Sequence, residues 1–103
     1  MPNSGMRAAQ PEGFEWDPAK ASINRRKHGT TFDEATTVWD DPNVFFEDDT
    51  KHSEAEERAK AIGFSERNRL LSVIFTDRNN AIRIITARKA SAADEATYQE
   101  ALG

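Results

Sequence analysis

The chain contains no cysteine among its 103 residues. This absence excludes disulfide bonds, thiolate metal ligands and cysteine catalysis. Long apolar runs are also missing, because no stretch approaches the roughly 18 apolar residues that a membrane span requires. The first residues lack the basic segment and following apolar run that mark a secretory signal. We therefore expect a cytoplasmic protein that does not contact membranes.

Positive charge is also in deficit, since 14 Lys and Arg stand against 18 Asp and Glu, for a net charge of −4. Proteins that coat nucleic acids are usually basic, so this balance argues against that class. The two signs are nevertheless separated along the chain. Acidic residues gather at 40–49, whereas positions 25–28 read Arg-Arg-Lys-His. An enzyme with a local basic site fits this pattern.

The composition, 37% hydrophobic and 31% charged, is typical of a small globular protein. Its length allows one domain and not two. Residues 1–13 are rich in Pro, Gly, Ser and Asn and show no periodicity, which predicts a flexible N-terminal tail. We expect residues 14–103 to form a single domain.

Three segments carry helix signals. Asp17-Pro18 begins a first helix that runs to about His28, where Gly29 stops it. A second helix follows between Thr31 and Pro42, and a third runs from Ser91 to about Leu102. The expected buried positions are Ala19 and Ile23 in the first helix, Phe32, Ala35, Val38 and Trp39 in the second, and Tyr98 and Leu102 in the third.

Strand patterns occupy 14–16, 44–47, 58–64, 70–76 and 82–87. The connectors 66–69 and 77–80 are turn-like, which predicts an antiparallel meander whose central strand, 70–76, is covered on both faces. The predicted fold class is therefore α+β: an antiparallel β-sheet with two N-terminal helices and a C-terminal helix, all on one side.

Several motifs in this order resemble one known family, the BrnT toxins. The resemblance covers about residues 14–98 and is carried by Phe14-Glu15-Trp16-Asp17-Pro18-Ala19-Lys20, Asn24, Lys27-His28-Gly29, Phe32-Asp33-Glu34-Ala35, Asp40-Asp41-Pro42, the run from His52 to Arg58, Ala61-Ile62-Gly63, and the run from Ile82 to Ala90.

The resemblance implies the toxin of a type II toxin–antitoxin system, with a RelE-like fold and the ability to cleave RNA. It also implies a BrnA-like antitoxin partner, through which alone the toxin would reach operator DNA. Two departures are visible. Relatives often carry Glu-Arg where this chain has Glu95-Ala96, and Val-Tyr-Thr where it has Ile74-Phe75-Thr76.

RNA can be cleaved without a metal when its 2′-OH attacks the adjacent phosphate. The reaction needs a base, an acid and cations on the developing phosphorane charge. No metal-ligand spacing or cofactor motif occurs in the sequence, so we expect no metal and no cofactor. With the resemblance, the candidate catalytic residues are His52, Glu57, Arg58, Arg83 and Arg88.

Each catalytic candidate has a structural alternative. Histidine titrates near neutrality, which suits His52 as the proton carrier. Glu57 is the other candidate, but the acids of this stretch could be a solvated run. Arg58 could pair with one of them. Arg83 could face solvent or pair with an acid across the sheet. In a regular strand Arg83 and Arg88 point to opposite faces, so both serve one site only if a bulge or the end of the strand re-aims Arg88.

A second group of candidates would bind RNA: Lys20, Arg26, Lys27, His28 and Lys89. Lys20, Asn24 and Lys27 share one helix face at i, i+4 and i+7. For His28 the alternative is capping of the helix end, where a positive side chain complements the macrodipole. Lys89 could equally be an ordinary turn charge. The aromatic residues could stack on bases, although their periodic spacing favours the core.

Two other functions stay open. The first is a binding module that has lost catalysis and serves as antitoxin partner and operon co-repressor; the net charge, Ala96 and Phe75 favour it. The second is a metal-dependent nuclease, for which the sequence lacks an acidic ligand cluster.

Overall fold

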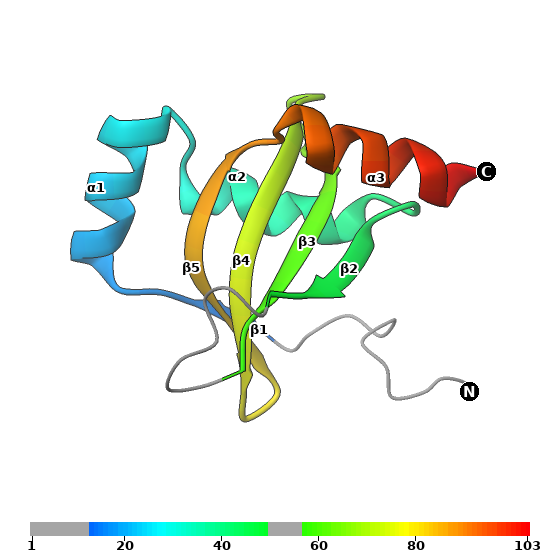
Figure 1. Ribbon diagram of the computed structural model, residues 1–103. Coiled ribbons are helices and arrows are strands. Elements are labelled where there is room, and N and C mark those ends of the chain that lie inside the picture. The colour runs from blue at the N-terminus through cyan, green and yellow to red at the C-terminus, as the bar shows by residue number, and fades with distance from the viewer. Residues whose placement is uncertain (1–12, 50–56) are drawn as a thin grey trace.

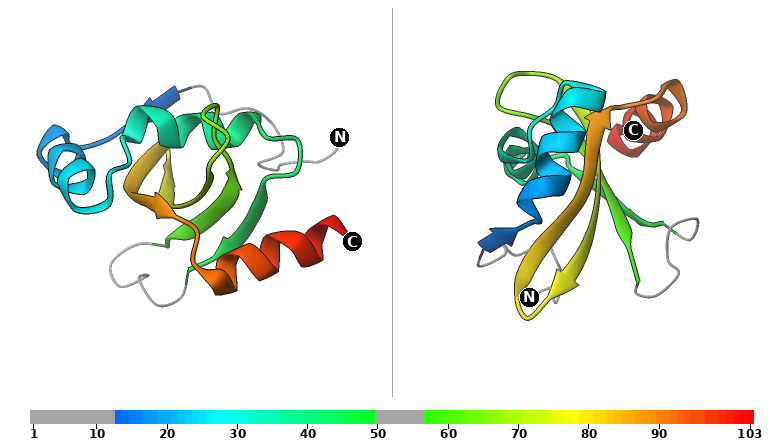
Figure 2. Two further views of the ribbon diagram at one scale, coloured as in Figure 1. Left: turned by 90° about the horizontal axis from the view of Figure 1, so that it is seen from above. Right: turned by 90° about the vertical axis from the view of Figure 1, so that its left-hand side faces the viewer.

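The computed structural model describes residues 13–49 and 57–103, which build a five-stranded sheet with helices on both faces (Figures 1 and 2). The elements in chain order are β1 (Gly13–Glu15), α1 (Pro18–His28), α2 (Phe32–Thr36), the 3₁₀ helix η1 (Thr37–Asp40), β2 (Phe45–Asp48), β3 (Ala59–Phe64), β4 (Leu70–Arg78), β5 (Ala81–Lys89) and α3 (Ala92–Leu102). Residues 1–12 of the expected tail lie outside the described residues, whereas Gly13 begins β1.

The sheet is mixed, so the prediction of an antiparallel sheet is wrong for one pair. The strand order is β1-β5-β4-β3-β2, and β1 runs parallel to β5 with Glu15 beside Arg83. The other three pairs are antiparallel. Turn residues predict the direction of strands joined by a hairpin, but β1 is followed by a helix. The position of β1 at the edge of the sheet and its direction depend on long-range packing, which local sequence does not encode.

The predicted turns are confirmed. Between β4 and β5 only Asn79 and Asn80 intervene, with φ of 50° and 70°. Two positive φ values give a turn whose twist matches that of the flanking strands, and Asn tolerates this conformation better than most residues. Between β3 and β4, Asn68 has φ 60°, and the Ser65 amide donates to the Arg69 carbonyl at 2.8 Å.

Helices cover both faces of the sheet, which corrects the expectation that all lie on one side (Figure 2). On one face α2 and η1 bury Val38 and Trp39, and the Trp39 ring meets the Phe75 ring edge-on at 5.0 Å. On the other face α3 packs Tyr98 against Phe64 at 5.6 Å. Neighbouring strand residues alternate in direction, so Gly63 and Phe64 face opposite layers. α3 packs against the face of β3 that carries the larger side chains, such as Phe64.

The helix ends agree with the sequence signals. Asp17 accepts a hydrogen bond from the Ala19 amide at 2.9 Å, Thr31 accepts from the Glu34 amide at 3.0 Å, and Ser91 accepts from the Asp94 amide at 3.1 Å. The second helix differs, because it is α-helical only to Thr36 and continues as the 3₁₀ helix η1. Its predicted buried residues, from Phe32 to Trp39, are buried.

Glu34 joins α2 to the turn between β3 and β4. Its carboxylate accepts a hydrogen bond from Ser65 at 2.6 Å and binds the Arg69 guanidinium in a bidentate pair. The Arg69 hydrogen bond, with help from Ser65, holds the pKa of Glu34 below its usual value although burial opposes this. Glu34, which the sequence places at the capping-box position of this helix, therefore binds the turn between β3 and β4 through its side chain.

Three predicted buried positions are wrong. Ala19 of α1 is exposed, Ile23 of α1 is 51% exposed and Leu102 of α3 is 49% exposed. α1 lies at the edge of the sheet beside β5 and buries little of its surface, so apolar spacing along it does not translate into burial (Figure 1). No helix in the described ranges is long and apolar enough to cross a bilayer.

Asn24 fixes α1 to the sheet instead. Its side-chain amide donates to the Ala87 carbonyl at 2.8 Å and to the Thr30 carbonyl at 2.9 Å, and its oxygen accepts from the Ala87 amide at 3.1 Å. Asn24 is 5% exposed and is the buried residue of α1. The backbone amide and carbonyl of Ala87 in β5 thus form hydrogen bonds with a side chain of α1.

We predict that Asn24→Ala lowers the free energy of unfolding by about 2–3 kcal/mol, because it leaves the buried polar groups of Ala87 and Thr30 without partners. Urea unfolding followed by circular dichroism measures this change. Ser22→Ala, on the exposed side of the same helix, should change stability by less than about 0.5 kcal/mol. Equal stability of the two variants would contradict the assignment.

Candidate functional site

A β-bulge in β5 shapes the sheet face on which α3 lies. Ile74 pairs with Thr86 and Phe75 pairs with Ile84, so Ile85 is an extra residue. The bulge changes the phase of the strand, and Arg83, opposite Thr76, comes to the same face as Arg88, opposite Ser72. The sequence analysis allowed these two arginines to share a site if a bulge or the end of the strand re-aimed Arg88, and the structure contains the bulge.

The part of this face that α3 does not cover contains a pocket of about 300 Å³, here called the sheet pocket. It is lined by His28, Asp49, Arg58, Lys60, Ser72, Ile74, Ile85, Thr86 and Arg88. The pocket thus brings together three sequence candidates: His28 from the end of α1, Arg58 from the position just before β3, and Arg88 from near the end of β5.

Arg88 and Lys60 contribute to the sheet pocket in different ways. Within residues 13–49 and 57–103, the exposed Arg88 side chain makes no hydrogen bond or ion pair. Lys60 is held by two carboxylates, at 3.0 Å from Asp94 and 3.8 Å from Glu47. The sequence analysis did not select Lys60. Its alternation with Arg58, two residues earlier, was the signal that could have found it.

Asp94 ties α3 to the wall of the sheet pocket. It is 6% exposed and accepts hydrogen bonds from Ser72 at 2.6 Å and Lys60 at 3.0 Å. Burial raises the pKa of Asp94, but the hydrogen bonds from Ser72 and Lys60 outweigh it, so the net pKa lies below the usual value. The carboxylate stays charged and fixes Lys60 in place.

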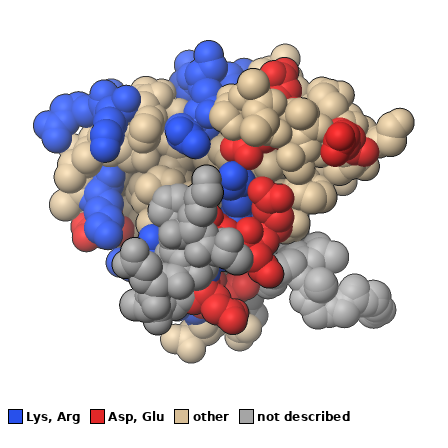
Figure 3. Space-filling model, in the orientation of Figure 1, with Lys and Arg blue, Asp and Glu red and all other residues tan. Residues whose placement is uncertain are grey.

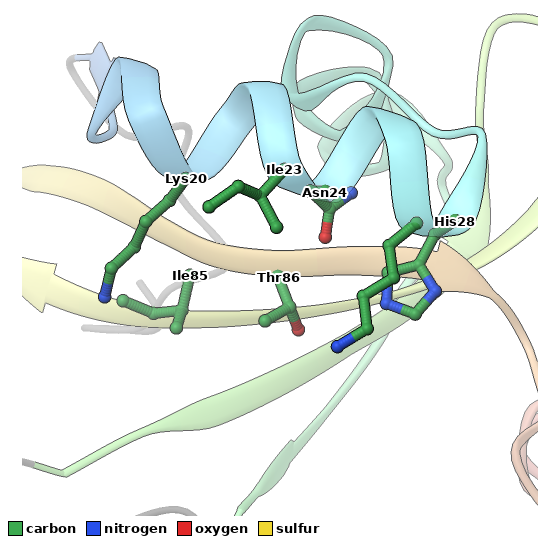
Figure 4. A pocket seen from close by; sticks show the side chains of 7 residues that line it. Lys20, Ile23, Asn24, His28, Ile85 and Thr86 are labelled. Atoms are coloured by element: carbon green, nitrogen blue, oxygen red, sulfur yellow. The ribbon is translucent and has the colours of Figure 1, made fainter.

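A second pocket, the helix pocket, lies between α1 and β5 (Figure 4) and measures about 210 Å³. Its lining consists of Lys20, Ile23, Asn24, Lys27, His28, Ile85 and Thr86. The helix face predicted from Lys20, Asn24 and Lys27 is therefore confirmed as one face. Because His28, Ile85 and Thr86 line both pockets, the two hollows adjoin.

A third pocket, of about 290 Å³, lies at the start of β3. Its lining is Asp48, Glu57, Arg58, Ala59, Phe75, Thr76 and Asp77. Arg58 belongs to this pocket and to the sheet pocket, and Thr76 donates to the Glu57 carbonyl at 2.7 Å. Among the described residues, no group of three or more His, Asp or Glu side chains is placed to hold a metal ion.

Charges of opposite sign occupy different parts of this face (Figure 3). Lys and Arg gather over α1, whose sequence PAKASINRRKH contains no acid, whereas Asp and Glu gather over α3 and beneath it. The separation expected from sequence position is thus a separation in space. A net negative chain keeps a basic edge next to the helix pocket.

Other candidates lie elsewhere. Arg83 forms an ion pair with Glu15 at 3.3 Å and lines none of these three pockets. Lys89, opposite Leu71, lies on the other face of the sheet from Arg88. Arg26 is exposed on α1 but does not line the helix pocket. His52 lies outside the described residues.

The structure also tests two further expectations, that the aromatic side chains form the core and that His28 caps the end of α1. Phe32, Trp39 and Phe75 are buried in the core, in agreement with the spacing argument. The αL residue Gly29 ends α1 through a hydrogen bond from its amide to the Arg25 carbonyl at 2.8 Å. Within the described ranges the His28 ring caps no carbonyl and instead lines two pockets.

Comparison with known proteins gives one consistent answer. Residues 16–94 match the family model described as the ribonuclease toxin, BrnT, of type II toxin–antitoxin systems. Among solved structures, the chain is similar to the crystal structure of the Brucella abortus ribonuclease toxin BrnT. The identity is 27% and the TM-score 0.60, over 77% of this chain and 96% of that one. The comparison with curated proteins found no match.

Asp94 makes stability depend on acid pH. Its pKa is lowered in the folded state, so its contribution is present above the unfolded value near 3.8 and is lost as pH falls through the folded value. We predict that Asp94→Asn lowers the free energy of unfolding at neutral pH by about 1–3 kcal/mol. Below about pH 4 the variant should decline less steeply than the parent. Urea unfolding across pH measures both effects.

The matched control is Glu95→Gln, which removes a charge from the exposed neighbour on α3. It should keep the parent's pH profile. Glu34 and Asp41 also have lowered pKa values, so part of the acid dependence should survive in every variant. A profile of Asp94→Asn that superimposes on the parent's would rule out the role given to Asp94.

Proposed function

This chain belongs to the BrnT family, the ribonuclease toxins of type II toxin–antitoxin systems, and on that premise we propose that it is an endoribonuclease that cuts RNA without a metal ion. The convergence of Arg58, Lys60 and Arg88 on the sheet pocket supports this function most directly. The two arginines suit a phosphate that gains charge during reaction, whereas Lys60 is already paired with Asp94 and Glu47.

The proposed reaction uses the RNA's own 2′-OH. A base removes the 2′-OH proton, the 2′-oxygen attacks phosphorus, and the bond from phosphorus to the 5′-oxygen breaks. An acid then protonates that leaving oxygen, which yields a cyclic phosphate and a 5′-OH end. Arg88 and Arg58 would hold the phosphate and stabilise the phosphorane charge, as guanidinium groups match phosphate oxygens.

Two candidate groups for proton transfer line the pockets that Arg58 also lines. Glu57 is exposed beside it, and His28 faces the sheet pocket from α1. An imidazole can both accept and donate a proton, so we add His28 to the earlier candidates, Glu57 and His52. Arg83 would act indirectly, because its ion pair with Glu15 joins β1 to β5.

A partner follows from the type II assignment. We infer a BrnA-like antitoxin that blocks RNA access to the sheet pocket, and contact with operator DNA only through that antitoxin. The part of the sheet face that α3 does not cover lies beside the Lys and Arg side chains of α1 and would suit an acidic inhibitory segment. The RelE-like relationship is part of the same proposal, supported by an antiparallel β2-β3-β4-β5 sheet between helices.

The co-repressor alternative is less well supported by the geometry of the two departures. Phe75 turns its ring into the core against Trp39 and Phe46, at 5.0 and 6.0 Å. Ala96 is exposed on α3. Neither residue lines the sheet pocket, in which Arg58 and Arg88 lie, although Phe75 lines the third pocket.

We predict that the purified chain cleaves RNA in excess chelator and leaves 5′-OH ends, and that Arg88→Ala slows cleavage about 100-fold. Gel analysis with end-group labelling measures both. Lys89→Ala is the matched control, since it removes the neighbouring positive charge on the opposite face; it should retain most activity. Activity that disappears with chelator would point to a metal-dependent nuclease.

Toxicity separates the enzyme from the binding module. Induction of the chain without antitoxin should arrest growth, and Arg88→Ala should relieve the arrest while keeping antitoxin binding. A growth assay with co-purification measures both properties. Unimpaired growth on induction of the folded parent would favour the co-repressor.

A further inference from the structure

The helix pocket has an apolar floor between positive side chains. Ile23 projects from α1 toward Ile85 on the bulged strand, with Lys20 on the same helix face (Figure 4). Ile23 is 51% exposed. In the described part of the chain it is one of three large hydrophobic side chains that are exposed, with Phe64 and Leu102. No residue of the described ranges covers it.

The polar groups available in this pocket are few. Asn24 lines it, but its amide is used by Ala87 and Thr30. Lys20, Lys27 and the Thr86 hydroxyl make no hydrogen bond or ion pair within the described residues. An occupant must therefore present an apolar face to the two isoleucines and negative charge to the two lysines.

A nucleotide in single-stranded RNA has this chemistry, because its base has an apolar face and its flanking phosphates are anionic. The volume, about 210 Å³, is below the roughly 300–1,000 Å³ of pockets for drug-sized ligands and suits a single ring system. No Phe, Tyr or Trp belongs to the lining of the helix pocket, so the apolar contact that it offers a base comes from Ile23 and Ile85.

Position favours the same occupant. The helix pocket shares His28, Ile85 and Thr86 with the sheet pocket. An RNA chain with a phosphate at Arg88 would therefore place a neighbouring base beside Ile23. The basic surface of α1 continues in that direction (Figure 3). A protein segment would fit the helix pocket only with an apolar side chain placed between acids, whereas every unpaired RNA nucleotide has an apolar base between phosphates.

We propose that the helix pocket is a nucleobase subsite, in which Ile23 and Ile85 contact one base and Lys20 and Lys27 hold its flanking phosphates. The subsite rests on the proposed function, since it extends the RNA path from the sheet pocket. It gives the enzyme a preference for unpaired RNA, because a base within a duplex cannot enter the pocket.

Binding of uncleavable RNA tests this without catalysis. The probe is a short single-stranded 2′-O-methyl RNA, together with versions that carry one abasic residue at each position in turn. Fluorescence anisotropy gives the affinity of the full chain and of Ile23→Ala, Lys27→Ala and Leu102→Ala over a range of salt concentrations. Leu102 is the matched control, because it is 49% exposed on α3.

Ile23→Ala should bind the intact RNA about three- to tenfold more weakly, with an unchanged dependence on salt, since it removes apolar contact and no charge. Lys27→Ala should reduce the slope of log affinity against log salt by about 0.7, the value for one phosphate contact in single strands. One abasic position should weaken binding to the parent but not to Ile23→Ala. Leu102→Ala should match the parent.

Two results would overturn the subsite. One is RNA affinity of Ile23→Ala equal to the parent's, including the case in which that variant instead loses antitoxin binding. The other is an abasic series in which every position behaves alike. If the parent still cleaves RNA in either case, only the subsite fails. If the folded parent neither binds nor cleaves RNA, the proposed function fails with it.

Discussion

The hydrogen bonds between Asn24 and Ala87 are the contact on which the site depends. α1 buries almost nothing apolar, so hydrophobic packing alone would not hold it beside β5. The Asn24 amide pairs with both backbone groups of Ala87, as a neighbouring strand would. This contact fixes the angle at which α1 crosses the strand and brings Lys20, Lys27 and His28 over the sheet face.

The bulge at Ile85 is the second constraint. It brings Arg83 and Arg88 to one face and aims Ile85 and Thr86 at α1. At the opposite border of the pocket, Asp94 and Ser72 fix α3 and hold Lys60. The face is therefore framed by two helices that come from the two ends of the described chain, each tied to the sheet by a buried polar side chain.

Buried and half-buried carboxylates have a common role in this fold. Glu34 joins α2 to Arg69, Asp41 accepts hydrogen bonds from the Phe64 amide and Tyr98, and Asp94 binds Ser72. Beside Asp41, burial and this hydrogen bond raise the pKa of Tyr98 to about 12. Part of the acidic excess thus serves the tertiary structure, which reconciles a net charge of −4 with a basic edge over α1.

The sequence by itself determined the helix ends, the hairpin turns, the buried face from Phe32 to Trp39 and the family, because these follow from short-range periodicity, capping and motif order. It did not determine the parallel pairing of β1, the seat of α3 on the second face, or the exposure of Ile23 and Leu102. Only the tertiary structure decided that Arg58, Lys60, Arg88 and His28 share a pocket while Lys89 does not. The physical reason is that these outcomes depend on one inserted residue in β5 and on contacts between segments far apart in the chain, such as Asn24 with Ala87.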